Sequence, residues 1–374
     1  MSASSRYCIL GPHPGNHSYS TVKYFNFCRR HLPQTLGCRV QARCPARGFL
    51  PTDDALPNQD RTEIWWQTYA LWPGSLFRLK SDCFHIIDQG LFWYSRFLRG
   101  GRRLGTVNDL IAYMSLAGSL PFAVPVPRKK FLIQENIRQL RKLDHVISPS
   151  RFTADCLMRE VGIPAARITV IPYHVDTGFT PVVPAEREQN RLKWFGTVSH
   201  AILHVGAPTV YKNRPGVIRA FSVLREKLPE AHLFCVGGAA TADERKLMED
   251  LRCSSCVTFL PAVSVAELRE IYTAADVLVF PSFYEGFGWP PLEAMASGCP
   301  VVSSTRASLR EVVADAALTV DDPHDNERIA SLLAEVLTDP RCAADLTRRG
   351  LARAACFSPE KSLNEVAGIY RMLA

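Results

Sequence analysis

The sequence predicts an α/β protein with two Rossmann-like, doubly wound domains that face a cleft. Three observations predict it. The 374 residues are too many for one ordinary domain. Short apolar runs alternate with longer helical stretches, which is typical of parallel sheets with crossover helices. A charged, proline-containing break at 180–190 separates two such series. We expect domains over 1–185 and 186–374, and the last helix, about 358–374, is a candidate to cross back to the first domain.

The first half begins with an apolar strand at 7–10, a turn-rich loop at 11–18 and a helix from about 20 to 31. In residues 41–82 the apolar residues follow neither the helical nor the strand period clearly. The tryptophans in that region are interpreted as core or interdomain packing, with a sugar-binding platform as the alternative: Trp65, Trp66 and Trp72. Further strands are expected at 85–88, 104–107, 145–148 and 168–172.

The second half repeats the alternation more regularly. Strands are expected at 202–205, 232–236, 257–260, 277–280, 300–303 and 317–320. Helices fit between them at about 215–228, 242–251, 265–274, 291–297 and 308–313, and the chain is helical after 323. Ligands of open parallel sheets bind at the carboxyl ends of the strands, so the loops there are the expected position of a site.

The composition indicates a soluble, reduced protein. It is 47% apolar and 21% charged. The polar start of the chain lacks the pattern of an export signal. Prolines interrupt the long uncharged stretch at 110–127, which predicts helix plus loop instead of a bilayer span. The twelve cysteines are scattered, and Cys253 and Cys256 lack the further ligands of a zinc site. We expect a cytoplasmic protein without bound metal.

The net charge of +8 is unevenly distributed. Residues 1–195 hold 26 Lys and Arg against 14 Asp and Glu, a net +12, whereas residues 196–374 hold 18 against 22, a net −4. The basic half predicts contact with an anionic membrane or a phosphorylated acceptor, and an ordinary solvated surface is the alternative. Nucleic acid is disfavoured because no recognition motif accompanies the charge.

The most informative segment is FPSFYEGFGWPPLEAM at 280–295, which begins where an apolar strand ends. Glycines on both sides of Phe287 let the backbone approach a ligand closely. A helix is expected to start at the proline pair that follows, and the start of a helix favours a diphosphate. Glu293 is expected in the first helical turn, where a carboxylate is stabilised and accepts hydrogen bonds from sugar hydroxyls. Glu285 would reach the other end of the same ligand.

A second segment, LHVGAPTVYKNRP at 203–215, follows another buried strand. Its short loop brings Lys212 to the start of the next helix. A lysine there can neutralise a leaving diphosphate, whose developing charge is the main electrostatic problem in sugar transfer. A solvated lysine at a helix start is the alternative.

Together these segments resemble family four of the retaining glycosyltransferases, which has the two-domain GT-B architecture. The pair Glu285 and Glu293 around Gly-Phe-Gly carries the resemblance, and GCPVV at 298–302 and VDDP at 320–323 extend it. The resemblance implies UDP- or GDP-sugar donors, no catalytic metal or other cofactor, and a lipid-linked glycan or polysaccharide acceptor. It assigns Glu293 to the donor ribose, Lys212 to the diphosphate, and Glu285 to the donor sugar, together with Gly286, Phe287 and Gly288.

The sequence departs from the family pattern at three positions. Ala207 and Tyr211 stand where an arginine is common near the lysine, which makes Arg214 the candidate for the second positive charge. Asn108, followed by Asp109, replaces the usual strand-end histidine. The first loop has one glycine where a pair is common. The acceptor or cleft candidates are Gly15, Asn16, His17, Asn108 and Asp109, with a surface role as the alternative for His17 and a structural role for His85.

Motif searches disfavour several other enzyme classes. No G-x-G-x-x-G follows the first strand, and there is no Walker A, G-x-S-x-G, H-E-x-x-H or D-x-D sequence. The sequence therefore predicts a retaining glycosyltransferase that uses a donor of the GDP-mannose or UDP-glucose type. Two alternatives are a synthase or phosphorylase-like enzyme of the same fold and a catalytically weak nucleotide-sugar-binding or scaffold protein.

Overall fold

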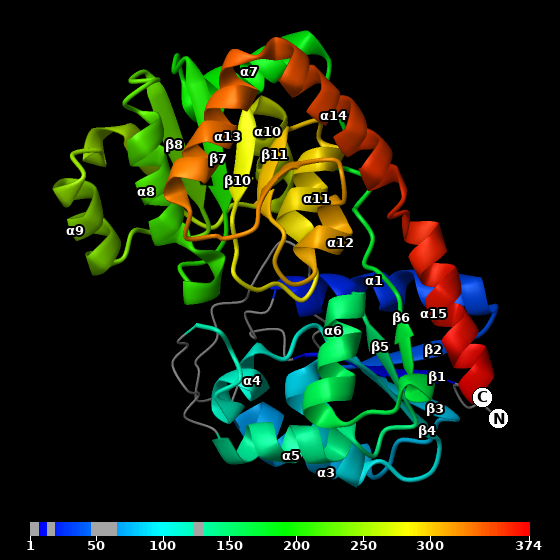
Figure 1. Cartoon of the computed structure of the whole chain (residues 1–374). Coiled ribbons are helices and arrows are strands. Elements are labelled where there is room, and N and C mark those ends of the chain that lie inside the picture. Colours follow the sequence, from blue (N-terminus) through cyan, green and yellow to red (C-terminus); the bar gives the residue numbers. More distant parts are fainter. Residues whose placement is uncertain (1–6, 13–18, 46–65, 123–129) are drawn as a thin grey trace. The chain divides into compact units, whose positions relative to one another are not determined.

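The computed structural model describes residues 7–12, 19–45, 66–122 and 130–374 (Figure 1). It divides into two compact units. Unit 1 comprises residues 1–121, 125–173 and 360–374, and unit 2 comprises 122–124 and 174–359. The predicted domain boundary at 185/186 falls inside helix α7 (Pro184–Phe195), all of which belongs to unit 2.

Unit 1 is a parallel six-stranded sheet with the order β2-β1-β3-β4-β5-β6 and flanking helices (Figure 1). Its strands are β1 (Tyr7–Leu10), β2 (Val40–Arg43), β3 (Cys83–Ile86), β4 (Arg102–Thr106), β5 (His145–Ser148) and β6 (Ile168–Val170). Its helices are α1 (Tyr19–Leu36), η1 (Trp66–Leu71), α3 (Trp72–Leu76), η2 (Gln89–Phe97), α4 (Ile111–Ala117), α5 (Lys130–Leu140), α6 (Arg151–Cys156), η3 (Leu157–Val161), η4 (Ala165–Arg167) and α15 (Pro359–Leu373). Every residue of β1, β3 and β5 is buried, as expected for parallel strands covered on both faces.

The last helix, α15, packs inside unit 1. Its buried Tyr370 forms a hydrogen bond of 2.8 Å between its Oη and Nδ1 of His85, and the rings of Tyr7 and Tyr370 lie 5.1 Å apart. The other ring nitrogen of His85 is 2.7 Å from Oγ1 of Thr106. Burial lowers the pKa of His85 to about 3, so the ring is neutral. The structural role expected for this histidine is confirmed.

Unit 2 is a second parallel six-stranded sheet, with the order β12-β11-β10-β7-β8-β9. Its strands are β7 (His200–Val205), β8 (Ala231–Val236), β9 (Val257–Leu260), β10 (Val277–Phe280), β11 (Val301–Ser304) and β12 (Leu318–Val320). Its helices are α7, η5 (Val210–Lys212), α8 (Arg214–Leu224), α9 (Ala242–Asp250), η6 (Ser254–Cys256), α10 (Val265–Ala274), α11 (Trp289–Ala296), α12 (Leu309–Val313), α13 (Asn326–Thr338) and α14 (Pro340–Ala355). Both units have the doubly wound parallel order that the sequence predicts.

Local capping determines where two of these helices begin. Thr241 accepts from the backbone N–H of Glu244 at 3.2 Å, and the Glu244 carboxylate accepts from the Thr241 N–H at 2.8 Å. Ser264 and Glu267 form the same reciprocal pair at the start of α10. Each capping box satisfies amides that the helix itself leaves unpaired, which explains why the predicted starts at 242 and 265 agree with the structure.

Two regions differ from the sequence-based prediction. Strand β2 lies in the segment without a clear period, where Val40 is its one large apolar residue and none of its residues is fully buried. The expected linker at 180–190 is wrong in part, because α7 begins at Pro184. Proline is well suited to a first helical turn, and Asn190 anchors the helix by donating to Oγ1 of Thr273 at 3.1 Å. In the described ranges, none of the helices is long and apolar enough to cross a bilayer.

Candidate functional site

The strand order of unit 2 creates a switch point beside β7. The chain runs from β7 to β8 and β9 on one side, then returns to place β10 on the other side of β7. In doubly wound sheets such a switch point separates the loops at the carboxyl ends and is the usual position of a ligand. The loops after β7 and β10 carry Lys212 and Glu285, respectively.

The loop after β7 places Lys212 in the short helix η5. A Cβ added to Gly206 would lie 3.1 Å from Cδ of Lys212, so the lysine stem runs along the glycine at the strand end. Asn213 follows in the left-handed region with φ 55°. Its Nδ2 donates to the carbonyls of Pro281 at 3.2 Å and Pro323 at 2.7 Å, which compensates for that conformation and joins the loop to the end of β10.

Lys212 and Glu285 form an ion pair, with 2.8 Å between Nζ and Oε1. Their side chains are only 14% and 11% exposed, so water screens the pair weakly. The ammonium also lies 4.8 Å from the centre of the Phe280 ring, and the Phe283 N–H donates to the Tyr211 carbonyl at 2.8 Å. The two loops therefore bring a cation and a carboxylate to one point, where the first can bind phosphate oxygen and the second can accept from a hydroxyl group.

The Gly-Phe-Gly loop is held by Ser308. Its hydroxyl lies 2.8 Å from the carbonyl oxygen of Glu285 and 2.6 Å from that of Phe287. Gly288 has φ 122°, and a Cβ there would lie 2.8 Å from Cδ2 of Leu309. Both the conformation and the close approach require glycine. These contacts fix the shape of the loop, and the use of its backbone for ligand binding stays a prediction.

Glu293 is not in the first turn of its helix. The helix α11 begins at Trp289, before the expected proline pair, and has no acidic residue in its first turn. The expectation that the helix start stabilises Glu293 is therefore wrong. The side chain is instead buried, with 2% exposed, and its Oε2 lies 3.4 Å from the Tyr272 hydroxyl. Its assignment to the donor ribose stays a prediction.

Arg214, expected as the second cation beside Lys212, is instead fully buried. Its Nε and Nη2 donate to the two carboxylate oxygens of Glu244 at 2.7 and 2.6 Å, and its remaining bonds go to the carbonyls of Gly238 and Ala239. Burial alone would raise the pKa of Glu244, but the bonds from Arg214 and Thr241 together with the Arg214 charge outweigh it, and that pKa is lowered. Arg214 thus joins the start of α8 to the loop after β8.

Of the unit 1 candidates, Asn108 bonds through its side chain to two uncharged hydroxyl groups. Asn108 Oδ1 accepts from the Tyr173 hydroxyl, and its Nδ2 donates to Oγ1 of Thr21 at 3.0 Å. The backbone N–H groups of Asn108 and Asp109 both donate to Oε1 of Gln89, at 2.7 and 3.1 Å. These bonds fix the end of β4. The three first-loop candidates lie outside the described residues: Gly15, Asn16 and His17.

His204, which no sequence motif singled out, lies fully buried near the end of β7. Its Nδ1 is 3.0 Å from the Val279 carbonyl, and its Nε2 has no hydrogen-bond partner among the described residues. Burial lowers the pKa of His204 to about 4. Ser308 was missed as well, because its contacts with the loop span more than twenty residues and leave no local pattern. Within the described ranges, no cluster of three His, Cys, Asp or Glu side chains is arranged to hold a metal ion.

Two family profiles match this chain. The profile described as Glycosyl transferases group 1 matches residues 189–353, and the profile described as Glycosyltransferase Family 4 matches residues 28–179. The chain is 30% identical to O-antigen chain mannosyltransferase B of Escherichia coli over 256 residues, which is 67% of this chain and 66% of that protein. The match therefore spans just under two thirds of the length of this relative.

Solved structures share the fold over nearly the whole chain. Sucrose-phosphate synthase from Thermosynechococcus elongatus superposes with a TM-score of 0.78 at 20% identity, covering 98% of this chain and 99% of that one. The Anabaena protein HepE in complex with UDP-glucose superposes with a TM-score of 0.76 at 16% identity, covering 98% and 99%. At these identities the similarity shows the two-domain fold.

Proposed function

Because the chain belongs to the group 1 glycosyl transferases of the family four type, we propose that it transfers a hexose from a nucleoside-diphosphate donor with retention of anomeric configuration. The observation that carries the proposal is the Lys212–Glu285 pair at the switch point of unit 2. It combines a cation for a diphosphate with an acceptor for sugar hydroxyls, and the rigid Gly-Phe-Gly loop follows directly.

The proposed donor is GDP-mannose or, as the second choice, UDP-glucose. A mannosyltransferase among the relatives supports the first, and a solved neighbour with bound UDP-glucose supports the second. The proposed acceptor is a lipid-linked glycan or a polysaccharide, which the O-antigen chain in that relative's name supports.

In the proposed reaction, Lys212 neutralises the diphosphate, Glu293 accepts hydrogen bonds from the ribose, and Glu285 accepts one from the sugar. The bond between the anomeric carbon and the phosphate oxygen breaks as the acceptor oxygen attacks from the same face. The departing phosphate oxygen takes the acceptor's proton, so no separate base is required. The lysine stabilises negative charge where it develops, in a weakly solvated position, and no metal or other cofactor takes part.

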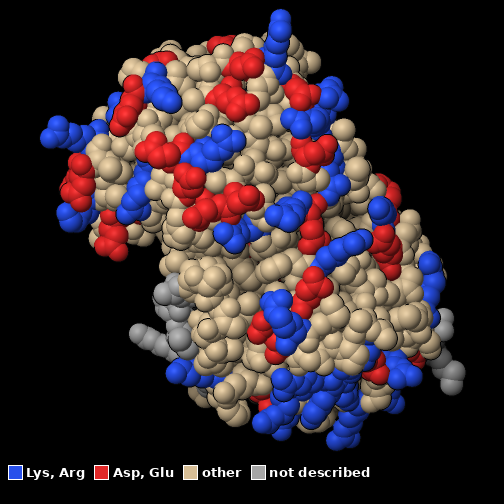
Figure 2. Space-filling view, in the orientation of Figure 1, with Lys and Arg blue, Asp and Glu red and all other residues tan. Residues whose placement is uncertain are grey.

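We also infer that the protein works in the cytoplasm, with its basic half at an anionic membrane surface. Figure 2 shows Lys and Arg gathered at the end of unit 1 where α3 and α5 lie. Each basic residue near an anionic surface contributes about 1 kcal/mol, and salt screens this attraction. Retention on anionic vesicles at low salt, lost at high salt, is the expected result, and a protein that never binds such vesicles contradicts the inference.

The test is thermal stabilisation and sugar release measured with UDP-, GDP-, ADP- and dTDP-sugars. One nucleotide should stabilise the parent protein, and Lys212→Ala and Glu293→Ala should both lose that stabilisation. Lys227→Ala removes an exposed lysine of the same unit and should behave like the parent. If no nucleotide sugar stabilises the protein, or if both site variants respond like the parent, the proposal is wrong.

One observation favours a second candidate function, a catalytically weak binding or scaffold protein. Asn108 stands where a histidine is usual, and its side chain already bonds to Tyr173 and Thr21. Such a protein would be stabilised by a nucleotide sugar but would not transfer the sugar to any acceptor offered. Turnover with a glycan or lipid-linked acceptor would exclude it.

A further inference from the structure

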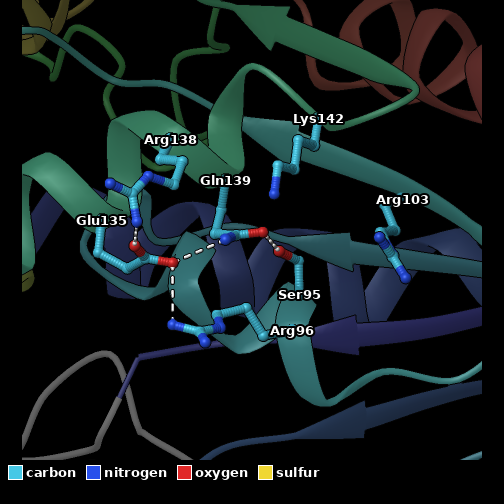
Figure 3. Close-up of a pocket in the computed structure, with 7 residues that line it drawn as sticks. All are labelled: Ser95, Arg96, Arg103, Glu135, Arg138, Gln139 and Lys142. Atoms are coloured by element: carbon cyan, nitrogen blue, oxygen red, sulfur yellow. Dashed lines mark hydrogen bonds and ion pairs between the residues drawn. The ribbon is translucent and has the colours of Figure 1, made fainter.

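Unit 1 contains a basic pocket of about 370 Å³ that the proposed transfer reaction does not use (Figure 3). It lies between η2, β4 and α5. Four cationic side chains line it, against a single carboxylate: Arg96, Arg103, Arg138 and Lys142, with Glu135.

The carboxylate is already fully engaged. Glu135 accepts from Nε2 of Gln139 at 2.7 Å, and it pairs with Arg96 at 3.3 Å and Arg138 at 3.1 Å. The bond from Gln139 and the two guanidinium groups lower the pKa of Glu135, so it stays ionised at neutral pH. Ser95 is bonded in turn to Oε1 of Gln139 at 3.1 Å. This network orients Arg96 and Arg138, which share the single negative charge of Glu135. The other two cations, Arg103 and Lys142, do not pair with this carboxylate.

Those two cations lie on the side of the pocket away from Glu135 (Figure 3). In the described part of the chain, the Lys142 side chain has no hydrogen-bond or ion-pair partner. Arg103 makes a single long contact of 3.4 Å, from Nη2 to the Leu98 carbonyl, and its buried Nε has no partner among the described residues. A buried N–H without a partner costs about 1–3 kcal/mol, so the Arg103 guanidinium is incompletely hydrogen-bonded in this structure.

We propose that this pocket binds a phosphate group through Arg103 and Lys142, with Arg96 and Arg138 completing the positive field. A phosphate presents several acceptor oxygens and one to two negative charges, which matches two unpaired cations better than a carboxylate does. Planar guanidinium groups and a flexible ammonium together suit a tetrahedral oxyanion.

The phosphate can come from a soluble ligand or from a lipid headgroup. Phe131 distinguishes the two sources, because its side chain is 74% exposed and lies one helical turn before Glu135 on α5. A ring beside the pocket would enter the interfacial region of a membrane but would add nothing for a phosphate in solution.

The experiment titrates inorganic phosphate against the full chain and follows thermal stabilisation. All proteins carry Lys212→Ala, which removes the cation proposed for the donor diphosphate. Adding Arg103→Gln and Lys142→Gln should raise the half-maximal phosphate concentration about tenfold. The matched control adds Arg219→Gln and Lys227→Gln, which remove one exposed arginine and one exposed lysine from unit 2 and should leave the titration unchanged.

A second arm measures retention on phosphatidylcholine vesicles with about a third phosphatidylglycerol. If the source is a lipid headgroup, the pocket pair (Arg103→Gln with Lys142→Gln) should reduce retention on the vesicles, and so should Phe131→Ser. Phe131→Ser should leave the phosphate titration unchanged. If the source is soluble, the pocket pair changes only the titration. Both results support the site.

The proposal is overturned if the Arg103→Gln/Lys142→Gln variant and the Arg219→Gln/Lys227→Gln control give the same phosphate titration and the same vesicle retention. The pocket is then an ordinary solvated basic surface. Lys142→Gln alone changes an exposed side chain and decides the question if the double variant is unstable. The donor-site variants test a different unit, so either proposal can fail without the other.

Discussion

The two units are built alike but use the ends of their strands differently. Each is a parallel six-stranded sheet whose order switches beside its first strand. In unit 2 the strand ends carry the ion pair of Lys212 and Glu285. In unit 1 the end of β4 carries Asn108, which bonds to two hydroxyl groups. One architecture therefore supports both a charged loop pair suited to a diphosphate and a strand end held by hydrogen bonds between uncharged side chains.

The cations of the two units are also distributed differently. Unit 2 buries Arg214 completely and pairs it with Glu244, so it stabilises the fold. Unit 1 holds Arg103 and Lys142 at a pocket without a carboxylate partner among the described residues.

The largest effect is expected from Arg214→Met. Removing one partner of a buried ion pair leaves Glu244 charged and uncompensated, which costs about 3–5 kcal/mol. Urea unfolding measures this loss. Arg219→Met, on the exposed side of the same helix, should change stability by about 0.5 kcal/mol or less. Similar losses of unfolding free energy in both variants would show that the buried ion pair matters no more for stability than an exposed arginine.

Lys212→Ala should come next. Loss of the cation at the departing diphosphate removes about 2.7–4 kcal/mol of transition-state stabilisation, or about 10²–10³ in kcat. Steady-state kinetics with the donor identified by the nucleotide panel measures it, with Lys227→Ala as the control. A variant that changes KM alone, with kcat intact, would show that the lysine only binds the donor.

Acid should destabilise each unit through its own buried histidine. Burial lowers the pKa of His85 to about 3 and that of His204 to about 4, from 6.5. Below pH 6.5 the unfolded chain takes up protons that the folded chain excludes, so stability is full above this pH and falls as the pH drops. Each histidine should cost about 2 kcal/mol between about pH 7 and pH 5.

The measurement for this pH effect is the free energy of unfolding across the same pH range. His85→Asn and His204→Asn should each flatten the pH slope by up to one proton, and the double variant should flatten it by both. A slope unchanged by either substitution would mean that other groups account for the acid sensitivity.

The smallest effect is expected from Asn108→Ala. The variant leaves the Tyr173 and Thr21 hydroxyls without this partner, which should cost about 1–2 kcal/mol of stability. Donor affinity should not change, because the neutral strand end is assigned no donor contact. A tenfold weaker donor affinity would show that the end of β4 in unit 1 also contributes to donor binding.

Much of unit 2 could be predicted from the sequence because its signals are local. Apolar runs marked the strands, and the helix starts expected at 242 and 265 coincide with the capping boxes that the structure shows at Thr241 and Ser264. Lys212 and Glu285 were expected in loops that follow strands of one parallel sheet, and the family resemblance assigned both to one donor ligand. The structure places them 2.8 Å apart.

The remaining features depend on contacts distant in sequence. The partner of Arg214 lies thirty residues away, on another helix, so nothing near Arg214 indicated that it would be buried. The half-buried strand β2 has too few apolar residues to show a period. The first turn of α11 was misplaced because proline fits both of the first helical positions, and the structure begins the helix at Trp289.

The return of α15 to unit 1 has a consequence for biosynthesis. Unit 1 is assembled from segments that precede and follow unit 2 in the chain. A ribosome therefore releases nearly all of unit 2 before it supplies Tyr370, the partner of His85. Domains made first usually fold first, but here the earlier unit must wait for the later one. Until then its sheet exposes apolar surface to the cell, so chaperones that hold nascent chains should bind the N-terminal unit for longer than the C-terminal one.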